Sequence, residues 1–78
     1  MTNLTKEARA ALQAVKEVVT FGNAVKATGG SKESCAAYDA ATAKENELYE
    51  AMNAAGMTRA QWAEYDRQSA VLYKNLNY

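Results

Sequence analysis

Apolar residues recur every three or four positions along three stretches of this chain, and two glycine-bearing breaks separate the stretches. This spacing is typical of amphipathic helices. The first stretch covers residues 5–27, with Thr5 as a candidate N-cap and Gly29 as a left-handed C-cap. Its apolar face is formed by Leu4, Ala8, Ala11, Leu12, Val15, Val18, Val19, Gly22 and Val25.

The second and third stretches have their own start signals. Residues 32–55 follow Ser31, a candidate N-cap, and Thr58 and Gln61 have the spacing of a capping box before the third stretch. The second apolar stripe is lean and consists of Ala37, Ala41, Leu48, Met52 and Ala55. The third is a heptad-like seam of Trp62, Tyr65, Ser69, Leu72 and Leu76.

These patterns predict an all-α fold, a compact antiparallel three-helix bundle with short glycine-containing turns. We expect the whole chain, residues 1–78, to form one domain, with helices at about 5–27, 32–55 and 59–76. Because both connections are short, consecutive helices are expected to be antiparallel neighbours. We expect these side chains to point inward: Leu12, Val15, Val19, Leu48, Met52, Trp62, Tyr65, Leu72 and Leu76.

Composition predicts a thin core. The chain has seventeen alanines but only five leucines, five valines and no isoleucine. Chains of this size often need disulfides, metals or self-association in addition to their core. Cys35 is the only cysteine and histidine is absent, which excludes an internal disulfide and a Cys/His zinc site. No cofactor or metal is therefore expected, and self-association is.

Charge and hydropathy narrow the classes of partner. The formal net charge is zero, so no overall field attracts nucleic acid or an anionic membrane. Residues 31–56 are acidic while the flanking segments are basic, which favours packing of the three segments together. No stretch is long and apolar enough to predict a membrane span or a signal sequence. A single unpaired cysteine fits a reducing compartment, and we expect a cytoplasmic location.

Catalysis is not expected. General acid–base chemistry most often uses histidine, which is absent. Cys35 lies one helical turn from Asp39, whose charge disfavours a thiolate. The carboxylate pairs on the helices have the pattern of a solvated outer face.

A row of tyrosine, asparagine and other polar residues on the second helix is the strongest candidate for a binding surface. Tyrosine and asparagine provide large contact area and adaptable hydrogen bonds. The row consists of Tyr38, Thr42, Glu45, Asn46, Tyr49 and Asn53. The alternative is that the tyrosines only flank the core with their hydroxyls in water. Glu45 either has a basic partner on another helix or awaits a group on a ligand. Val71 and Tyr78, on the outer side of the third helix, form a candidate second surface.

The sequence therefore predicts a small non-enzymatic binding protein that acts by occupying a surface of a macromolecular partner, as an inhibitor or adaptor. Its alanine-, asparagine- and tyrosine-rich helical character looks like that of small accessory proteins encoded by bacteriophages. Two alternatives stay open. One is a homo-oligomer that sequesters a small ligand or nucleotide between its subunits, and the other is a purely structural homo-oligomer.

Overall fold

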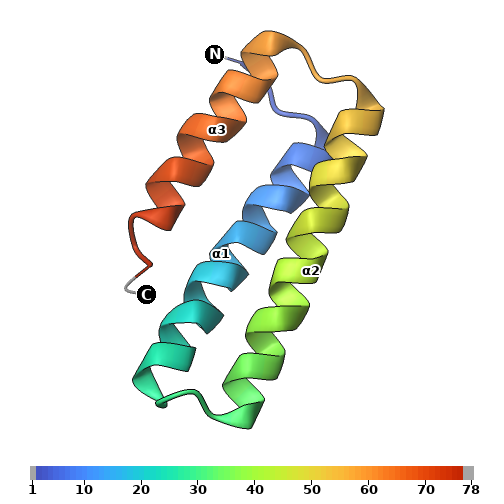
Figure 1. The fold of residues 1–78 in the computed structure, drawn as a ribbon. Coiled ribbons are helices and arrows are strands. Elements are labelled where there is room, and N and C mark those ends of the chain that lie inside the picture. Colours follow the sequence, from blue (N-terminus) through green and yellow to red (C-terminus); the bar gives the residue numbers. More distant parts are fainter. Residues whose placement is uncertain (1, 77–78) are drawn as a thin grey trace.

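The computed structural model describes residues 2–76, and that part of the chain folds into three helices without a strand. They are α1 (Lys6–Ala27), α2 (Lys32–Ala55) and α3 (Arg59–Tyr73), each antiparallel to the one before it (Figure 1). The Cα positions extend over 40 × 22 × 13 Å. The predicted all-α three-helix bundle is confirmed.

Each helix begins at the residue that the sequence indicates. The hydroxyl of Thr5 accepts a hydrogen bond from the amide of Ala8 (3.1 Å), and Ser31 caps α2 in the same way. At α3 the capping box is complete: the Gln61 amide donates to the Thr58 hydroxyl, and the Thr58 amide donates to the Gln61 side chain. Because these bonds satisfy amides that lack a partner within the helix, they fix where each helix starts.

The turn between α1 and α2 depends on glycine. Gly29 and Gly30 have φ angles of 68° and 83°, a region that favours glycine. Their amides donate back to the carbonyls of Lys26 and Val25, respectively. This pair of bonds is a Schellman motif, which ends α1 and sends the chain back along it.

Helix α1 provides most of the core. Its buried residues are Ala8, Ala11, Leu12, Ala14, Val15, Val18, Val19 and Gly22, whereas α2 buries only Ala41 and Met52, and α3 only Tyr65. All nine side chains predicted to point inward are buried or half-buried. Ala55, also placed in the apolar stripe of α2, is exposed and is the last residue of that helix.

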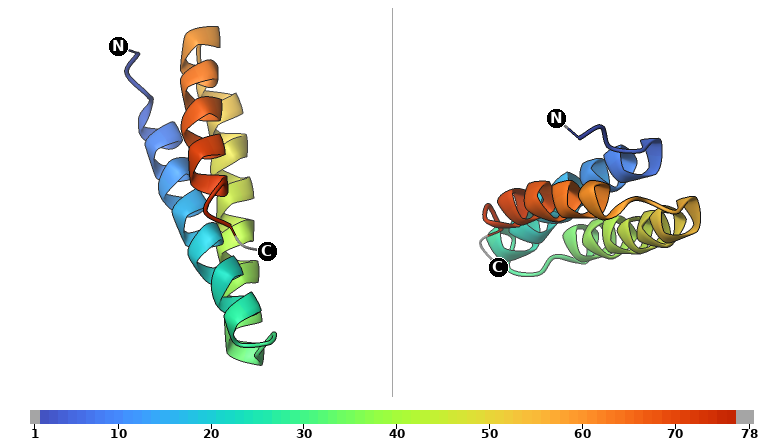
Figure 2. Two further views of the ribbon diagram at one scale, coloured as in Figure 1. Left: turned by 90° about the vertical axis from the view of Figure 1, so that its left-hand side faces the viewer. Right: turned by 90° about the horizontal axis from the view of Figure 1, so that it is seen from above.

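The backbone of α3 packs against α1 and stands away from α2 within residues 2–76. Side chains bridge the space between α2 and α3. Tyr49 of α2 packs on Trp62 and Tyr65 of α3, with ring centroids 5.2 and 6.4 Å apart. Figure 2 shows α1 crossing beside both other helices. The short turn thus makes α2 and α3 antiparallel, but large aromatic side chains hold their backbones apart.

The third helix is shorter than predicted, because it ends at Tyr73 and not near residue 76. The amides of Asn75 and Leu76 donate to carbonyls three residues back, which tightens the chain after the helix. The side chain of Asn23 on α1 donates to the carbonyl of Asn75 (2.9 Å). Leu76 then lies against Gly22, where an added Cβ would be 2.8 Å from the Leu76 Cδ1 atom. The contacts that Asn75 and Leu76 make with α1 are therefore more favourable than the further helical turn that the apolar spacing predicts.

Met52 is the largest fully buried side chain, and its truncation tests the thin core. We expect Met52→Ala to lower the free energy of unfolding by ~2–4 kcal/mol, because it removes apolar contacts and leaves a cavity. The measurement is urea denaturation followed by circular dichroism. Glu50→Ala, at an exposed position of the same helix, should change stability little. Equal effects of the two substitutions would show that Met52 is not a core residue.

Candidate functional site

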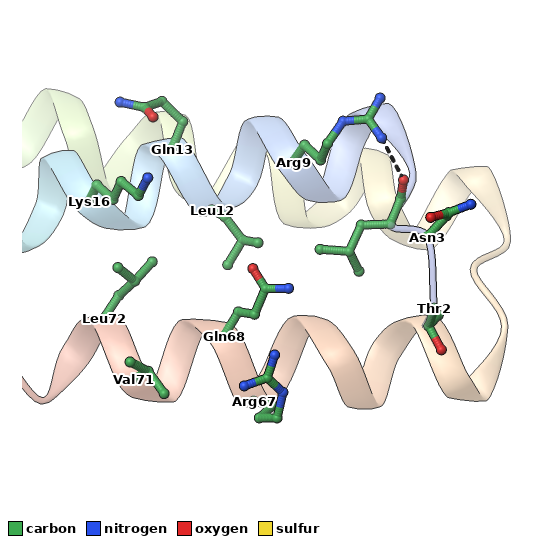
Figure 3. A pocket seen from close by; sticks show the side chains of 11 residues that line it. Thr2, Asn3, Arg9, Leu12, Gln13, Lys16, Arg67, Gln68, Val71 and Leu72 are labelled. Atoms are coloured by element: carbon green, nitrogen blue, oxygen red, sulfur yellow. Dashed lines mark hydrogen bonds between the residues drawn. The ribbon is translucent and has the colours of Figure 1, made fainter.

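A groove of about 620 Å³ runs between α1 and α3 and is bordered at one end by the N-terminal segment (Figure 3). Its α1 side is formed by Arg9, Leu12, Gln13 and Lys16, which are close together because i, i+3, i+4 and i+7 positions share one helix face. Its α3 side is formed by Arg67, Gln68, Val71 and Leu72, and its end by Thr2, Asn3 and Leu4.

The groove combines an apolar floor with cationic edges. Figure 3 shows Leu12 of α1 and Leu72 of α3 both pointing into the space between the two helices, with Gln68 opposite Leu12. Leu4 and Val71 add to this aliphatic lining. Arg9, Lys16 and Arg67 are its charged residues, and no aspartate or glutamate lines it among residues 2–76. The lining is therefore apolar with two cations, Arg9 and Lys16, that form no ion pair with a described residue, and a third, Arg67, that is paired with Glu64 beside the groove.

Two of the three cations are held in place. A guanidinium nitrogen of Arg9 donates to the backbone carbonyl of Leu4 (2.9 Å). Arg67 makes a two-point contact with the carboxylate of Glu64, with 3.2 Å between Nε and Oε1. The Gln68 amide also donates to that carboxylate (2.6 Å). Hydrogen bonds from Arg67, and then from Gln68, lower the pKa of Glu64 to about 2. Because a guanidinium carries five N–H donors, both arginines keep donors for a further acceptor.

Lys16 differs from the two arginines because its side chain makes neither a hydrogen bond nor an ion pair with any described residue, whereas Arg9 donates to the Leu4 carbonyl and Arg67 pairs with Glu64. Its side chain lies at the α1 edge of the groove and is exposed. Of the three cations in the groove, Lys16 is therefore the one whose charge is least compensated.

Half of the predicted row on α2 faces other helices. Tyr38 is half-buried against Gly22 of α1. Both carboxylate oxygens of Glu45 lie 2.8 Å from the hydroxyl of Tyr73 on α3, which donates to them. Of the two alternatives for Glu45, the basic partner is not found because the phenol of Tyr73 takes that place, and the ligand group stays a prediction. Tyr49 contacts α3 through its ring while 45% of the residue stays exposed.

The other residues of the row make no hydrogen bond to another helix in the described part of the chain. The hydroxyl of Thr42 donates to the carbonyl of Tyr38 on its own helix (2.9 Å), and Asn46 and Asn53 are exposed. The row therefore joins α2 to α3 at Glu45 and Tyr49 and is open to solvent at its asparagines. Whether a partner also uses this row stays a prediction.

Two phenols of α3 have raised pKa values. Burial raises the pKa of Tyr65 to about 12. Burial, and then the hydrogen bond to Glu45, raise the pKa of Tyr73 well above its ordinary value. Both hydroxyls therefore stay protonated at neutral pH, and Tyr73 can act as a hydrogen-bond donor to Glu45.

Of the predicted second surface, Val71 is 51% exposed and lines the groove, whereas Tyr78 lies outside the described residues. The sequence pattern does not single out Arg9, Lys16 or Arg67 and does not combine them with Val71. A usable signal was the spacing of Arg9, Gln13 and Lys16 along one edge of the apolar face of α1. Their proximity to Arg67 depends on how α3 packs on α1, which periodicity does not specify.

Two other classes of site, metal clusters and membrane-spanning helices, are absent from the described residues. No group of three or more potential metal-binding side chains occurs among residues 2–76. Within the same range, no helix has the length and apolar character that a membrane crossing requires. Comparisons with protein-family models, with curated proteins and with solved structures found no match to this chain.

Tyr49→Ala tests whether the aromatic contact holds α3 against α2. Because Tyr49 packs on both Trp62 and Tyr65, its truncation should lower the free energy of unfolding by ~1–2 kcal/mol. Urea denaturation monitored by tryptophan fluorescence measures the change, and Asn53→Ala on the exposed part of the row is the control. An unchanged midpoint for Tyr49→Ala would show that the ring contacts contribute nothing to folding.

Titration of Glu64 tests the anchoring of Arg67. In the folded protein its carboxyl should titrate near pH 2, below its ordinary 4.5, and Arg67→Gln should raise that pKa. Since the folded-state pKa is depressed, the associated stability is present above about pH 4.5 and is lost as pH falls toward 2. Carboxyl carbon NMR measures the titration, with Arg59→Gln as the control on the same helix. A wild-type value near 4.5 would contradict the paired arrangement.

Proposed function

We propose that this protein is a non-enzymatic binding protein that acts by occupying a surface of a macromolecular partner, as an inhibitor or adaptor does. The observation that carries the proposal is the groove between α1 and α3. It places four aliphatic residues beside three cations, of which Arg67 is paired with the adjacent Glu64, and no carboxylate of residues 2–76 lines it. Concave surfaces that combine apolar area with a few fixed polar groups are typical binding sites.

The construction of the groove supports binding more than catalysis. Its side chains are arginine, lysine, amide, threonine and aliphatic groups, and none of them is paired with a neighbour as nucleophile and base. Two arginines are already positioned by Leu4 and Glu64, which reduces the entropy lost when a partner binds. We place the interaction in the cytoplasm, where Cys35 would stay a free thiol.

Site-specific photo-crosslinking in cells that express the protein tests this function. A photoreactive phenylalanine derivative replaces Val71 in the groove or, as the control, the exposed Ala36 on α2. We expect a defined adduct with one cellular macromolecule from position 71 and none of that adduct from position 36. Absence of an adduct at position 71, or the same products from both positions, would contradict the proposal.

A further inference from the structure

We infer that the partner segment seated in the groove between α1 and α3 is an acidic amphipathic α-helix of another protein. This inference rests on the proposed binding function and specifies the chemistry of the partner. The charges supply the first argument. Arg9 and Lys16 lie on the α1 edge and Arg67 on the α3 edge, and no carboxylate lines the groove among the described residues. A segment with glutamates or aspartates on both flanks would meet a cation on each side.

The spacing of the edge residues fits a helix. Arg9 and Lys16 are separated by i, i+7, which is two helical turns or ~10 Å. Carboxylates two turns apart on a partner helix repeat at the same interval. The edges of the groove are themselves helices, so their backbone amides and carbonyls are already used and cannot pair with an extended strand. Side chains must therefore make the contacts.

The floor specifies the apolar side of the partner. Leu12 and Leu72 face the groove from opposite helices, and Val71, half-exposed, widens the aliphatic strip. Leucines at i, i+3 or i+4, and i+7 of a partner helix would cover this strip. This aliphatic area favours a protein helix over nucleic acid, whose contacts are dominated by phosphate. In Figure 3, α2 lies behind α1, so it is not one of the two helices that border the groove.

The hydrogen bonds already present make the site ready for carboxylates. Arg9 uses one donor on the Leu4 carbonyl, and Arg67 uses its Nε and one terminal nitrogen on Glu64. Their other N–H groups, together with the ammonium of Lys16, are available to acceptors on a partner. Because only about two turns of each helix line the groove, the contact is short and favours a transient complex.

The experiment uses the whole protein, labelled with nitrogen-15, and two synthetic helical peptides of about 18 residues, ~27 Å long. The acidic peptide carries leucines at i, i+4 and i+7 with glutamates on both flanks, and its counterpart replaces every glutamate with lysine. NMR titration measures affinity and maps the amides whose shifts change. We expect only the acidic peptide to bind, with shifts at groove residues and an affinity that falls as salt is added.

Charge reversal provides the matched test. Lys16→Glu should weaken binding of the acidic peptide about tenfold, and the double variant Arg9→Glu with Lys16→Glu should bind the lysine peptide instead. Lys32→Glu makes the same change of charge at an exposed position of α2 and should leave both affinities unchanged. Both Arg9 and Lys16 are exposed on α1, so circular dichroism should show that the variants stay folded.

Several outcomes would overturn the inference. Equal binding of the two peptides, or shifts confined to the row on α2, would show that the groove does not select acidic helices. A single-stranded oligonucleotide that binds the groove more tightly than the acidic peptide would assign it to nucleic acid. A dimer in sedimentation, with NMR shifts that place Val71 in its interface, would assign the groove to a second copy of the chain. If crosslinking at position 71 still traps a protein while the acidic peptide fails, the binding function stands and the chemistry of the partner is wrong.

Discussion

Burial of one face of α1 is the interaction on which the rest of this structure depends. That face supplies most of the buried residues, and both other helices pack on it. Its buried side chains are alanine, valine and leucine as far as Val19. At Gly22 the face has no side chain, and Leu76 and Tyr38 approach the backbone closely there. Without α1, the remaining two helices would share only a few aromatic and hydrogen-bonded contacts.

The division of side chains between α2 and α3 follows from this arrangement. The surface that α2 presents to α1 is rich in alanine, so the two backbones come close together along their length. Helix α3 carries Trp62 and Tyr65, whose bulk keeps it away from α2 while Tyr49 fills the space between them. The same offset leaves the groove on the other side of α3, between Leu72 and the charged edge of α1. The aromatic contact and the candidate site are thus two consequences of one packing geometry.

Much of the fold could be predicted from local signals. The helix starts at Thr5, Ser31 and Thr58 depend on residues three positions away, and the glycine turn at residues 29–30 depends on its own backbone angles. The end of α3 could not be predicted in this way. It is determined by Asn23 and Gly22, which are more than fifty residues earlier in the chain.

The candidate site, too, could be predicted only in part, because its geometry depends on contacts between residues far apart in the sequence. The sequence identified Val71 as an outward apolar residue and Glu45 and Tyr49 as a distinctive row, and both observations have structural meaning. It could not show that Glu45 faces Tyr73, or that Lys16 and Arg67 lie along one groove. These relations depend on the rotation of α3 about its own axis and on its distance from α2. An apolar period of three or four residues leaves both quantities undetermined.

Native-state hydrogen exchange, measured amide by amide under mildly denaturing conditions, tests the central role of α1 most directly. If all other packing depends on that helix, its amides at residues 12–19 should exchange most slowly, at the rate of global unfolding. The amides of α3, which has Tyr65 as its one buried residue, should open at lower free energy. Slowest exchange in α3, with α1 opening first, would contradict this account.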